Sequence, residues 1–278
     1  MGKIIAVCNQ KGGTGKTTSA INLATYMALL GKKVMLVDLD PQANTTSGVG
    51  INRHNVSKST YHILLEEIDI QEIIQKTAIE NLWLAAANLD LTGAEVELVS
   101  VMGREYRLKK ALQKEKENFD FIIVDSPPSL GLLTINSLCA ADSVLIPVQC
   151  EYYALEGVTQ LANTINLVRN NLNPDLTIEG VVLTMADFRT NLTKEVVGEV
   201  RNYFKEKVYK TVIPRSIRLS EAPSYGKPIA VYDKDSLGAQ KYEELAREIL
   251  SIASLDAKVD NYEVNSTSNT VRQEQAGA

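Results

Sequence analysis

The residues with the clearest chemistry form a glycine-rich loop at positions 11–18, KGGTGKTT, which follows an apolar run at positions 4–7. Phosphate-binding loops have the pattern Gly-x-x-x-x-Gly-Lys-[Ser/Thr], and the last two residues of that pattern are here Lys16 and Thr17. Gln10 replaces the leading glycine, so the loop is a variant. Its glycines allow backbone N–H groups to turn toward a phosphate, and the N-terminus of a following helix adds a positive dipole. The pattern predicts that Lys16 contacts the outer phosphates and that the Thr17 hydroxyl binds Mg²⁺.

Acidic side chains end two apolar runs further along the chain. The run FIIVD ends in Asp125, as expected for the second acidic element that helps to hold the metal ion. The run VMLVDLD contains Asp38 and Asp40. Ligands of open parallel sheets bind beyond the carboxyl ends of the strands. The loop and the carboxylates together therefore predict a phosphate and Mg²⁺ site at that edge of a sheet.

Two alternating kinds of segment must position these residues. Continuous apolar runs are typical of strands covered on both faces. They occur at residues 3–9, 34–40, 82–86, 121–125, 143–149, 180–184 and 211–213. Amphipathic segments, typical of helices, occur at residues 17–30, 105–116, 156–170, 193–207 and 236–252. The alternation predicts an α/β fold with a doubly wound, mostly parallel sheet and helices on both faces.

The chain is expected to form a single domain. No internal repeat and no Pro/Gly-rich linker divides it. From Leu255 onward the sequence becomes polar and loses its periodicity, which is typical of disordered segments. We therefore expect one phosphate-loop domain over residues 1–253 and a disordered tail over residues 254–278.

Composition favours a soluble cytoplasmic protein. No apolar run approaches the length of about 20 residues needed to span a bilayer, and the N-terminal run is too short for a signal peptide. The three cysteines, Cys8, Cys139 and Cys150, are odd in number and widely spaced, which fits neither a disulfide framework nor a paired zinc site.

Charge is unevenly distributed. The net charge is −5, yet the segment from Arg189 to Arg218 holds eight positive and three negative side chains and so carries +5. The remaining residues therefore carry −10. Such an asymmetry fits either a polyanion-binding face or a solvated helix surface.

Four longer sequence stretches form a set of motifs, and three of them contain the glycine-rich loop or the strand-end aspartates. They read NQKGGTGKTTSAINLA, VDLDPQANTTSGVG, FIIVDSPPSLG and VIPRSIRLSEAPSYGKPI. Together they resemble the motifs of the ParA family of deviant Walker ATPases, specifically chromosomal ParA proteins of the Soj type, from about Gly2 to Ile252. Thr14 stands where the family usually has valine, and Ala43 where it usually has glycine. Neither departure removes a ligand.

The resemblance implies a role for each residue of the site. Lys11 resembles the signature lysine, which crosses a dimer interface to contact the phosphates of ATP in the opposing protomer. Asp40 is implied to orient the attacking water, and Asp125 to support Mg²⁺ through its water shell. The residues implied to bind ATP are Lys11, Gly12, Gly13, Thr14, Gly15, Lys16, Thr17, Thr18, Met185, Pro214 and Arg215. ATP is favoured over GTP because the chain lacks an Asn-Lys-x-Asp motif and because the strand ends near Thr184 and Pro214 match the family's adenine pocket.

The resemblance also implies partners. Arg189 and Arg218 align with arginines that the family uses to bind double-stranded DNA without sequence preference. An ATP-dependent homodimer doubles the number of phosphate contacts, so ATP is expected to switch DNA binding and nucleoid association. The DNA-bound ParB-type centromere protein is implied to stimulate a slow ATP hydrolysis and to reset the cycle.

Three alternatives remain open. A MinD-like membrane ATPase should carry a basic amphipathic C-terminal helix, whereas the apolar spacing in residues 236–252 favours packing on the sheet. A reductase that shares an iron–sulfur cluster between subunits needs a pair of cluster cysteines, and Cys139 and Cys150 fit buried apolar positions better. A related ATPase that positions another cargo on the nucleoid has the same sequence signals. His54 and His62 lack a nearby nucleophile motif, which favours surface or helix-cap roles.

Overall fold

The computed structural model describes residues 1–151 and 154–251, and the predicted tail from residue 254 lies outside them. The described residues form a sheet with strand order β3-β4-β2-β5-β1-β6-β7-β8. Every neighbouring pair is parallel except β3 and β4. The strands are β1 Lys3–Val7, β2 Val34–Asp38, β3 Ile74–Lys76, β4 Leu82–Ala85, β5 Phe121–Asp125, β6 Ser143–Gln149, β7 Thr177–Ala186 and β8 Val208–Pro214. The predicted fold class is confirmed.

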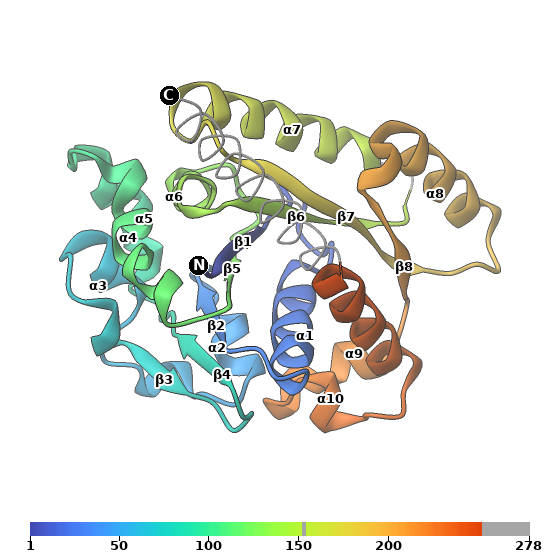
Figure 1. Cartoon of the computed structure of the whole chain (residues 1–278), viewed down its shortest axis with the longest axis horizontal. Helices are drawn as coiled ribbons and strands as arrows, with labels where there is room; N and C mark the ends of the chain where they lie inside the picture. The colour runs from blue at the N-terminus through green and yellow to red at the C-terminus, as the bar shows by residue number, and fades with distance from the viewer. Residues whose placement is uncertain (152–153, 252–278) are drawn as a thin grey trace, which may run out of the picture.

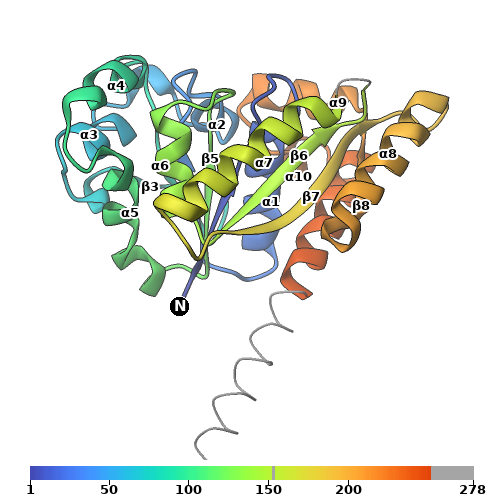
Figure 2. The same ribbon diagram turned by 90° about the horizontal axis from the view of Figure 1, so that it is seen from above.

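Helices cover both faces of this sheet (Figures 1 and 2). The helices are α1 Lys16–Leu29, α2 Asn44–Gly48, α3 Thr60–Leu65, α4 Leu91–Glu97, α5 Arg107–Leu112, α6 Leu132–Ala140, α7 Ala154–Asn171, α8 Asn191–Phe204, α9 Ile217–Glu221 and α10 Ile229–Tyr232. Residues 237–251 form a further helix. No helix within the described residues combines the length and the apolar character needed to cross a membrane.

The core consists of two layers because successive side chains of a strand point to opposite faces. In β1, Ile4 and Ala6 pack in the layer that also holds buried side chains of α3 to α8. Ile5 and Val7 pack in the other layer, against α1 and the helix at residues 237–251. This two-sided burial explains why the strands are continuously apolar.

The C-terminus of α1 is set by a glycine, as expected from the sequence. Gly31 has φ 86°, which an L-residue adopts only at a cost of about 1–2 kcal/mol. The N–H groups of Gly31 and Lys32 donate to the carbonyls of Ala28 and Met27, which closes the last turn in a Schellman motif. The chain then reverses directly into β2.

Several predicted boundaries were wrong. The segment 105–116 is not one helix, because α5 is flanked by 3₁₀ turns at Arg104–Tyr106 and Lys114–Glu117. Helix α8 ends at Phe204, since Lys205 has φ 50° and cannot continue it. Strands β7 and β8 are longer than predicted, because polar residues of these outer strands also join the ladder.

The minor predictions about cysteines, histidines and the last helix are largely confirmed. All three cysteines are buried and free, and burial raises the pKa of Cys8 to about 12. His62 caps α3 through the backbone N–H of Ser59, while His54 is exposed. In the helix at residues 237–251, the side chains of Tyr242, Leu245, Ala246 and Ile249 are buried in the core, but Leu237 is exposed.

Candidate functional site

The glycine-rich loop connects the carboxyl end of β1 to the N-terminus of α1. Gly13 and Gly15 have φ values of 76° and 85°, so both positions favour glycine. Gly15 precedes the first residue of α1 and has no side chain that could cap the N-terminus of this helix. Its free N–H groups and positive dipole are therefore available to an anion.

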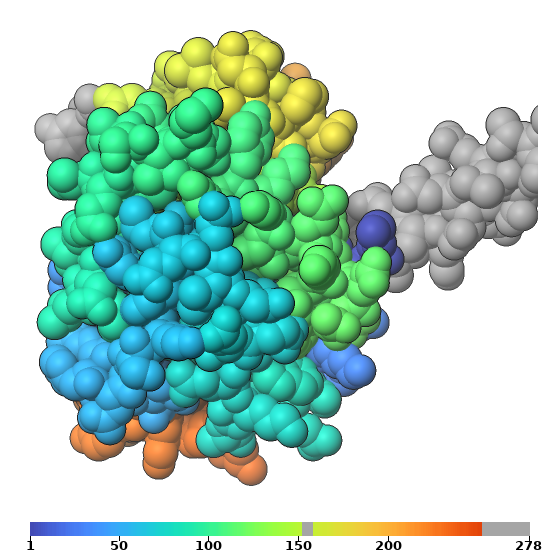
Figure 3. Space-filling view, turned by 90° about the vertical axis from the view of Figure 1, so that its left-hand side faces the viewer, coloured from blue at the N-terminus to red at the C-terminus, as the bar shows by residue number. Residues whose placement is uncertain are grey.

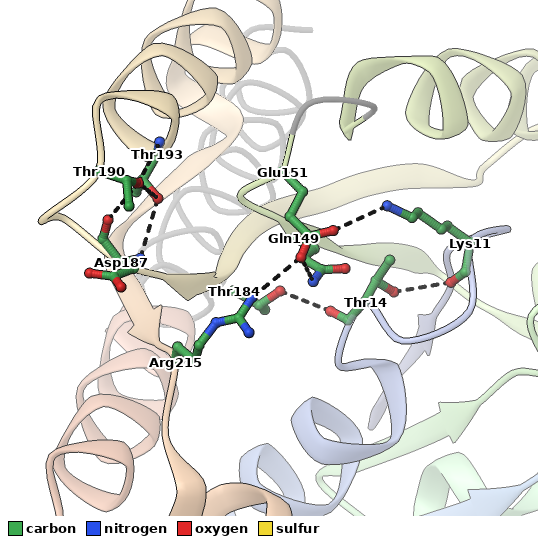
Figure 4. A network of polar contacts seen from close by, with 9 residues as sticks. All are labelled: Lys11, Thr14, Gln149, Glu151, Thr184, Asp187, Thr190, Thr193 and Arg215. Carbon is green, nitrogen blue, oxygen red and sulfur yellow. Dashed lines mark hydrogen bonds and ion pairs between the residues drawn. The ribbon is translucent and has the colours of Figure 1, made fainter.

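Side chains from the neighbouring strands hold this loop in place. The Thr184 hydroxyl at the end of β7 donates to the carbonyl of Thr14 at 2.9 Å (Figure 4). The Asn9 amide donates to the carbonyl of Pro147 in β6 at 2.7 Å, and its oxygen accepts the N–H of Lys11 at 3.0 Å. Thr14 is buried, so the residue that departs from the family pattern fits the packing.

Lys16 is the buried cation of the loop. Its side chain is only 6% exposed, and its ammonium donates to the carbonyl of Lys11 at 3.0 Å. Burial lowers the pKa of Lys16, while the carboxylates of Asp125 and Asp40 oppose that shift. A bound anion would compensate this buried charge more completely than one carbonyl does.

Two fully buried carboxylates lie beside the loop, at the ends of adjacent strands. Asp38 of β2 and Asp125 of β5 are direct partners in the sheet register. Burial raises the pKa of Asp38 to about 7, and the nearby charge of Asp125 adds to the shift. Burial likewise raises the pKa of Asp125 to about 6, against the opposing effect of the Thr45 and Thr17 hydroxyls. The Oδ1 atom of Asp125 is buried and has no hydrogen-bond partner among the described residues.

Asp40 lies in the loop that follows β2. Its carboxylate is 7% exposed, and Oδ1 accepts the N–H of Gln42 at 2.9 Å. Ala43, which immediately precedes α2, has φ 50° and ψ 38°. This left-handed conformation explains why glycine would fit well at position 43.

Lys11 is engaged within its own protomer. Its ammonium lies 3.6 Å from Glu151, just beyond the end of β6, and Glu151 also contacts Arg215 at 3.3 Å (Figure 4). The Lys11 side chain is 40% exposed, so a pair of this kind contributes about 0–1 kcal/mol. Lys11 can therefore exchange this partner for a stronger anion.

A cavity of about 230 Å³ lies next to the loop, between the ends of β7 and β8. Gly15 and Thr18 form its loop side, and Met185, Pro214 and Arg215 line the remainder together with Tyr242 and others. The structure thus brings these candidate ligands of the base to one place. A larger groove of about 800 Å³, between α3, β3 and α5, contains none of the motif residues (Figure 3).

The two arginines aligned with DNA-binding positions follow the carboxyl ends of the outer strands β7 and β8. Arg189 is 89% exposed and pairs with Asp187, which holds the pKa of that carboxylate at about 2. Arg218 in α9 pairs with Glu221 and Asp233. Both side chains therefore lie at the sheet edge that carries the loop, and each is partly neutralised by its own chain.

Sequence reasoning missed three residues that contact the predicted site. Glu151 links Lys11 to Arg215, and the hydroxyls of Thr45 and Thr46 donate to Asp125 and Asp38. Thr45 and Thr46 stand within the motif stretch VDLDPQANTTSGVG, close in sequence to Asp38 and Asp40. This position could have identified the two threonines as candidate hydrogen-bond donors to the carboxylates. Glu151 had no comparable sequence signal.

Known proteins resemble this chain over most of its length. Residues 2–178 match a family model described as an AAA domain. The chain is 59% identical over 249 residues to the sporulation initiation inhibitor protein Soj of Bacillus subtilis, covering 90% of this chain and 98% of that relative. It is 54% identical to the chromosome partitioning protein ParA of Myxococcus xanthus, covering 90% and 88%.

Solved structures share the same architecture. The crystal structure of cobyrinic acid a,c-diamide synthase from Mycobacterium smegmatis with a bound ATP analogue and magnesium has a TM-score of 0.79 to this chain. The two are 37% identical, and the match covers 90% of this chain and 95% of that one. The MinD cell division ATPase of Pyrococcus furiosus, at 25% identity and a TM-score of 0.76, covers 91% and 100%.

Proposed function

The chain belongs to the ParA family of chromosome-partitioning ATPases, in its Soj branch, and on that premise we propose that it is a Mg²⁺-dependent ATPase that switches between monomer and dimer. ATP binding forms a sandwich dimer that binds double-stranded DNA without sequence preference. Hydrolysis, stimulated by a ParB-type partner, resets the protein during chromosome segregation. The proposal rests on three groups that lie at one loop with free backbone N–H groups. They are the side chains of Lys11 and Lys16 and the Oδ1 atom of Asp125, which has no hydrogen-bond partner among the described residues.

The residues at the loop fit a Mg²⁺–nucleotide complex. A buried carboxylate oxygen without a hydrogen-bond partner is costly, and a hydrated cation would satisfy Asp125 Oδ1. Thr17 would ligate the ion, while Asp40 and Asp125 would act through water. Bound Mg²⁺ supplies neutralisation of the charge on the phosphates. The backbone of the loop and Lys16 orient the phosphates, and Met185, Pro214 and Arg215 surround the base.

Lys11 is proposed to join the two protomers. Two facing triphosphates repel each other, whereas a lysine from each side converts that repulsion into attraction. In the single protomer Lys11 pairs with Glu151. Because both side chains are partly exposed, this ion pair is weak, and Lys11 can leave Glu151 for a phosphate of the opposing ATP. ATP therefore becomes part of the interface, and loss of the γ-phosphate weakens it.

Light scattering tests the switch directly. Wild-type protein is expected to be dimeric with Mg²⁺ and ATP and monomeric with ADP or without nucleotide, and to bind random-sequence DNA only in the dimeric state. Lys11→Ala is expected to need at least a hundredfold more protein to dimerise with ATP, because one charge-assisted contact is worth about 1.5–3 kcal/mol and the interface has two such contacts. ATP binding by Lys11→Ala, measured by equilibrium titration, serves as the control. Equal dimerisation of the two proteins would contradict the role of Lys11.

DNA binding is proposed to depend on Arg189 and Arg218. Each replacement by alanine is expected to weaken binding to all sequences alike, and removing a charge that meets one phosphate should lower the salt slope by about one unit. ATP-driven dimerisation should remain. Arg247→Ala is the matched control, because Arg247 is likewise an exposed arginine that pairs with a carboxylate close to it in the chain. An unchanged salt slope in both the Arg189 and the Arg218 variant would exclude these arginines from the interface.

We place the protein in the cytoplasm, associated with the nucleoid when it holds ATP, and we assign the ATPase to one domain over residues 1–253.

The name of the M. smegmatis protein implies a different activity. The identity of 59% to Soj, against 37% to that protein, supports the partition function. A related ATPase with another cargo would use the same site, and a pull-down with ParB-type protein bound to DNA distinguishes the two.

A further inference from the structure

Two consecutive threonines of α2 contact the carboxylates that end β2 and β5. The Thr45 hydroxyl donates to Oδ2 of Asp125 at 2.6 Å. The Thr46 hydroxyl and N–H both donate to Oδ2 of Asp38, at 2.7 and 2.8 Å. All four residues are fully buried. Helix α2 therefore bridges the ends of two adjacent strands through hydrogen bonds to charged groups, which are stronger than neutral ones.

The loop that carries Asp40 lies between these anchors. At its start, the N–H of Asp40 donates to Oδ1 of Asp38 at 3.1 Å. Within it, the N–H of Ala43 donates to the carbonyl of Asp40 at 2.8 Å. At its end, Thr45 and Thr46 hold α2 against the two strands. The position of the Asp40 carboxylate thus depends on both buried aspartates.

The two oxygens of Asp125 have different surroundings. Oδ2 accepts the short hydrogen bond from Thr45, whereas Oδ1 is buried and unpartnered among the described residues. A carboxylate fixed through one oxygen presents the other in a defined direction. Outer-shell hydrogen bonds of this kind orient the ligands of metal sites.

We propose that Thr45 is a positioning residue that couples the cation-binding carboxylate Asp125 to the loop that carries Asp40. The Thr45 hydroxyl holds Oδ2, which leaves Oδ1 for the hydrated Mg²⁺, and the same residue fixes the start of α2. Occupancy of the cation site and the placement of Asp40 are thereby linked. The inference rests on the proposed function, since it takes Asp125 as the carboxylate that supports Mg²⁺.

Titration with Mg²⁺ tests the link. Thr45→Val removes the hydroxyl but keeps the shape of the side chain, and we expect the Mg²⁺ concentration for half-maximal ATP binding to rise about tenfold. Thr45→Ser keeps the hydroxyl and should remain within about twofold of wild type. Ser47→Ala is the matched control in α2, because the Ser47 side chain makes none of these bonds. A purely structural role would lower the melting temperature and leave the Mg²⁺ titration unchanged.

Hydrogen exchange without nucleotide and with EDTA provides a second readout. The amides of residues 40–46 should exchange at least about tenfold faster in Thr45→Val, and at the wild-type rate in Thr45→Ser and Ser47→Ala. If Thr45→Val does not fold, Thr45→Ala serves for the same measurements. Wild-type Mg²⁺ dependence and wild-type exchange in the variant lacking the hydroxyl would overturn the proposal. A wild-type protein whose ATP hydrolysis and ATP-driven dimerisation do not depend on Mg²⁺ would instead overturn the proposed function, while the exchange experiment would still report on the bond to Asp125.

Discussion

Lys16→Ala is expected to bind ATP at least a hundredfold more weakly than the wild type and to remain monomeric at ATP concentrations that saturate the wild type. Lys16 is buried at the base of the loop, and its ammonium has only the Lys11 carbonyl as a hydrogen-bond partner among the described residues of the protomer. Two charge-assisted bonds to phosphate oxygens, at about 1.5–3 kcal/mol each, correspond to at least a hundredfold in affinity.

Equilibrium titration with ATP and Mg²⁺ measures this effect, and Lys33→Ala is a matched control. Lys33 is an exposed lysine that precedes β2, at the opposite edge of the sheet from the loop. The Lys33→Ala substitution changes the net charge by the same amount as Lys16→Ala. A purely long-range electrostatic effect would therefore weaken ATP binding equally in both variants. Normal ATP affinity in Lys16→Ala would contradict the assignment of the loop.

The strands near the centre of the sheet were predictable because their burial is two-sided. Phe121–Asp125 and Ser143–Gln149 have the predicted bounds, since both faces of these strands require apolar side chains and an aspartate, Asp120 or Asp142, precedes each run. The outer elements carry weaker signals. Strand β3 has three residues, Ile74–Lys76, of which two are polar, and it pairs in the antiparallel direction with β4 alone. Such a segment has no sequence period from which a strand could be identified.

Short helices were missed for a related reason. Helix α6 reads LLTINSLCA and is buried on most sides, so its sequence shows no amphipathic stripe. Helix α2 has five residues and is held by hydrogen bonds to Asp38 and Asp125 rather than by an apolar face. Neither helix has the 3.6-residue alternation that identifies a helix from sequence alone.

The site was predictable where local spacing determines it. The loop at residues 11–18 and the strand-end aspartates occupy one edge of the sheet because the parallel topology brings the carboxyl ends together. No comparable rule predicts which side chains make contact when they lie far apart in the chain. The hydrogen bond from Thr45 to Asp125 joins residues that are 80 positions apart in the chain. Glu151 follows β6, which lies between β1 and β8 in the sheet, and it contacts Lys11 after β1 and Arg215 after β8.

Asp40→Ala is expected to lower ATP turnover by about a hundredfold or more and to accumulate as a dimer on DNA. Groups that position water or accept its proton contribute roughly 10²–10⁴-fold in rate. The Asp40 carboxylate is almost buried beside the loop and raises the pKa of Lys16, so it lies close to the charged centre of the site. Steady-state ATPase assays and co-sedimentation with random-sequence DNA measure the two effects.

The combination of the two readouts separates catalysis from folding. A variant that lost turnover because the loop collapsed would also lose ATP binding and dimerisation, since Asp40 Oδ1 accepts the N–H of Gln42. Asp40→Asn keeps an oxygen acceptor for that bond and should share the loss of turnover, whereas Asp175→Ala, at an exposed position before β7, should behave as the wild type. Slow turnover with retained dimerisation in both Asp40 variants therefore assigns the carboxylate charge to hydrolysis, and wild-type turnover in either variant excludes it.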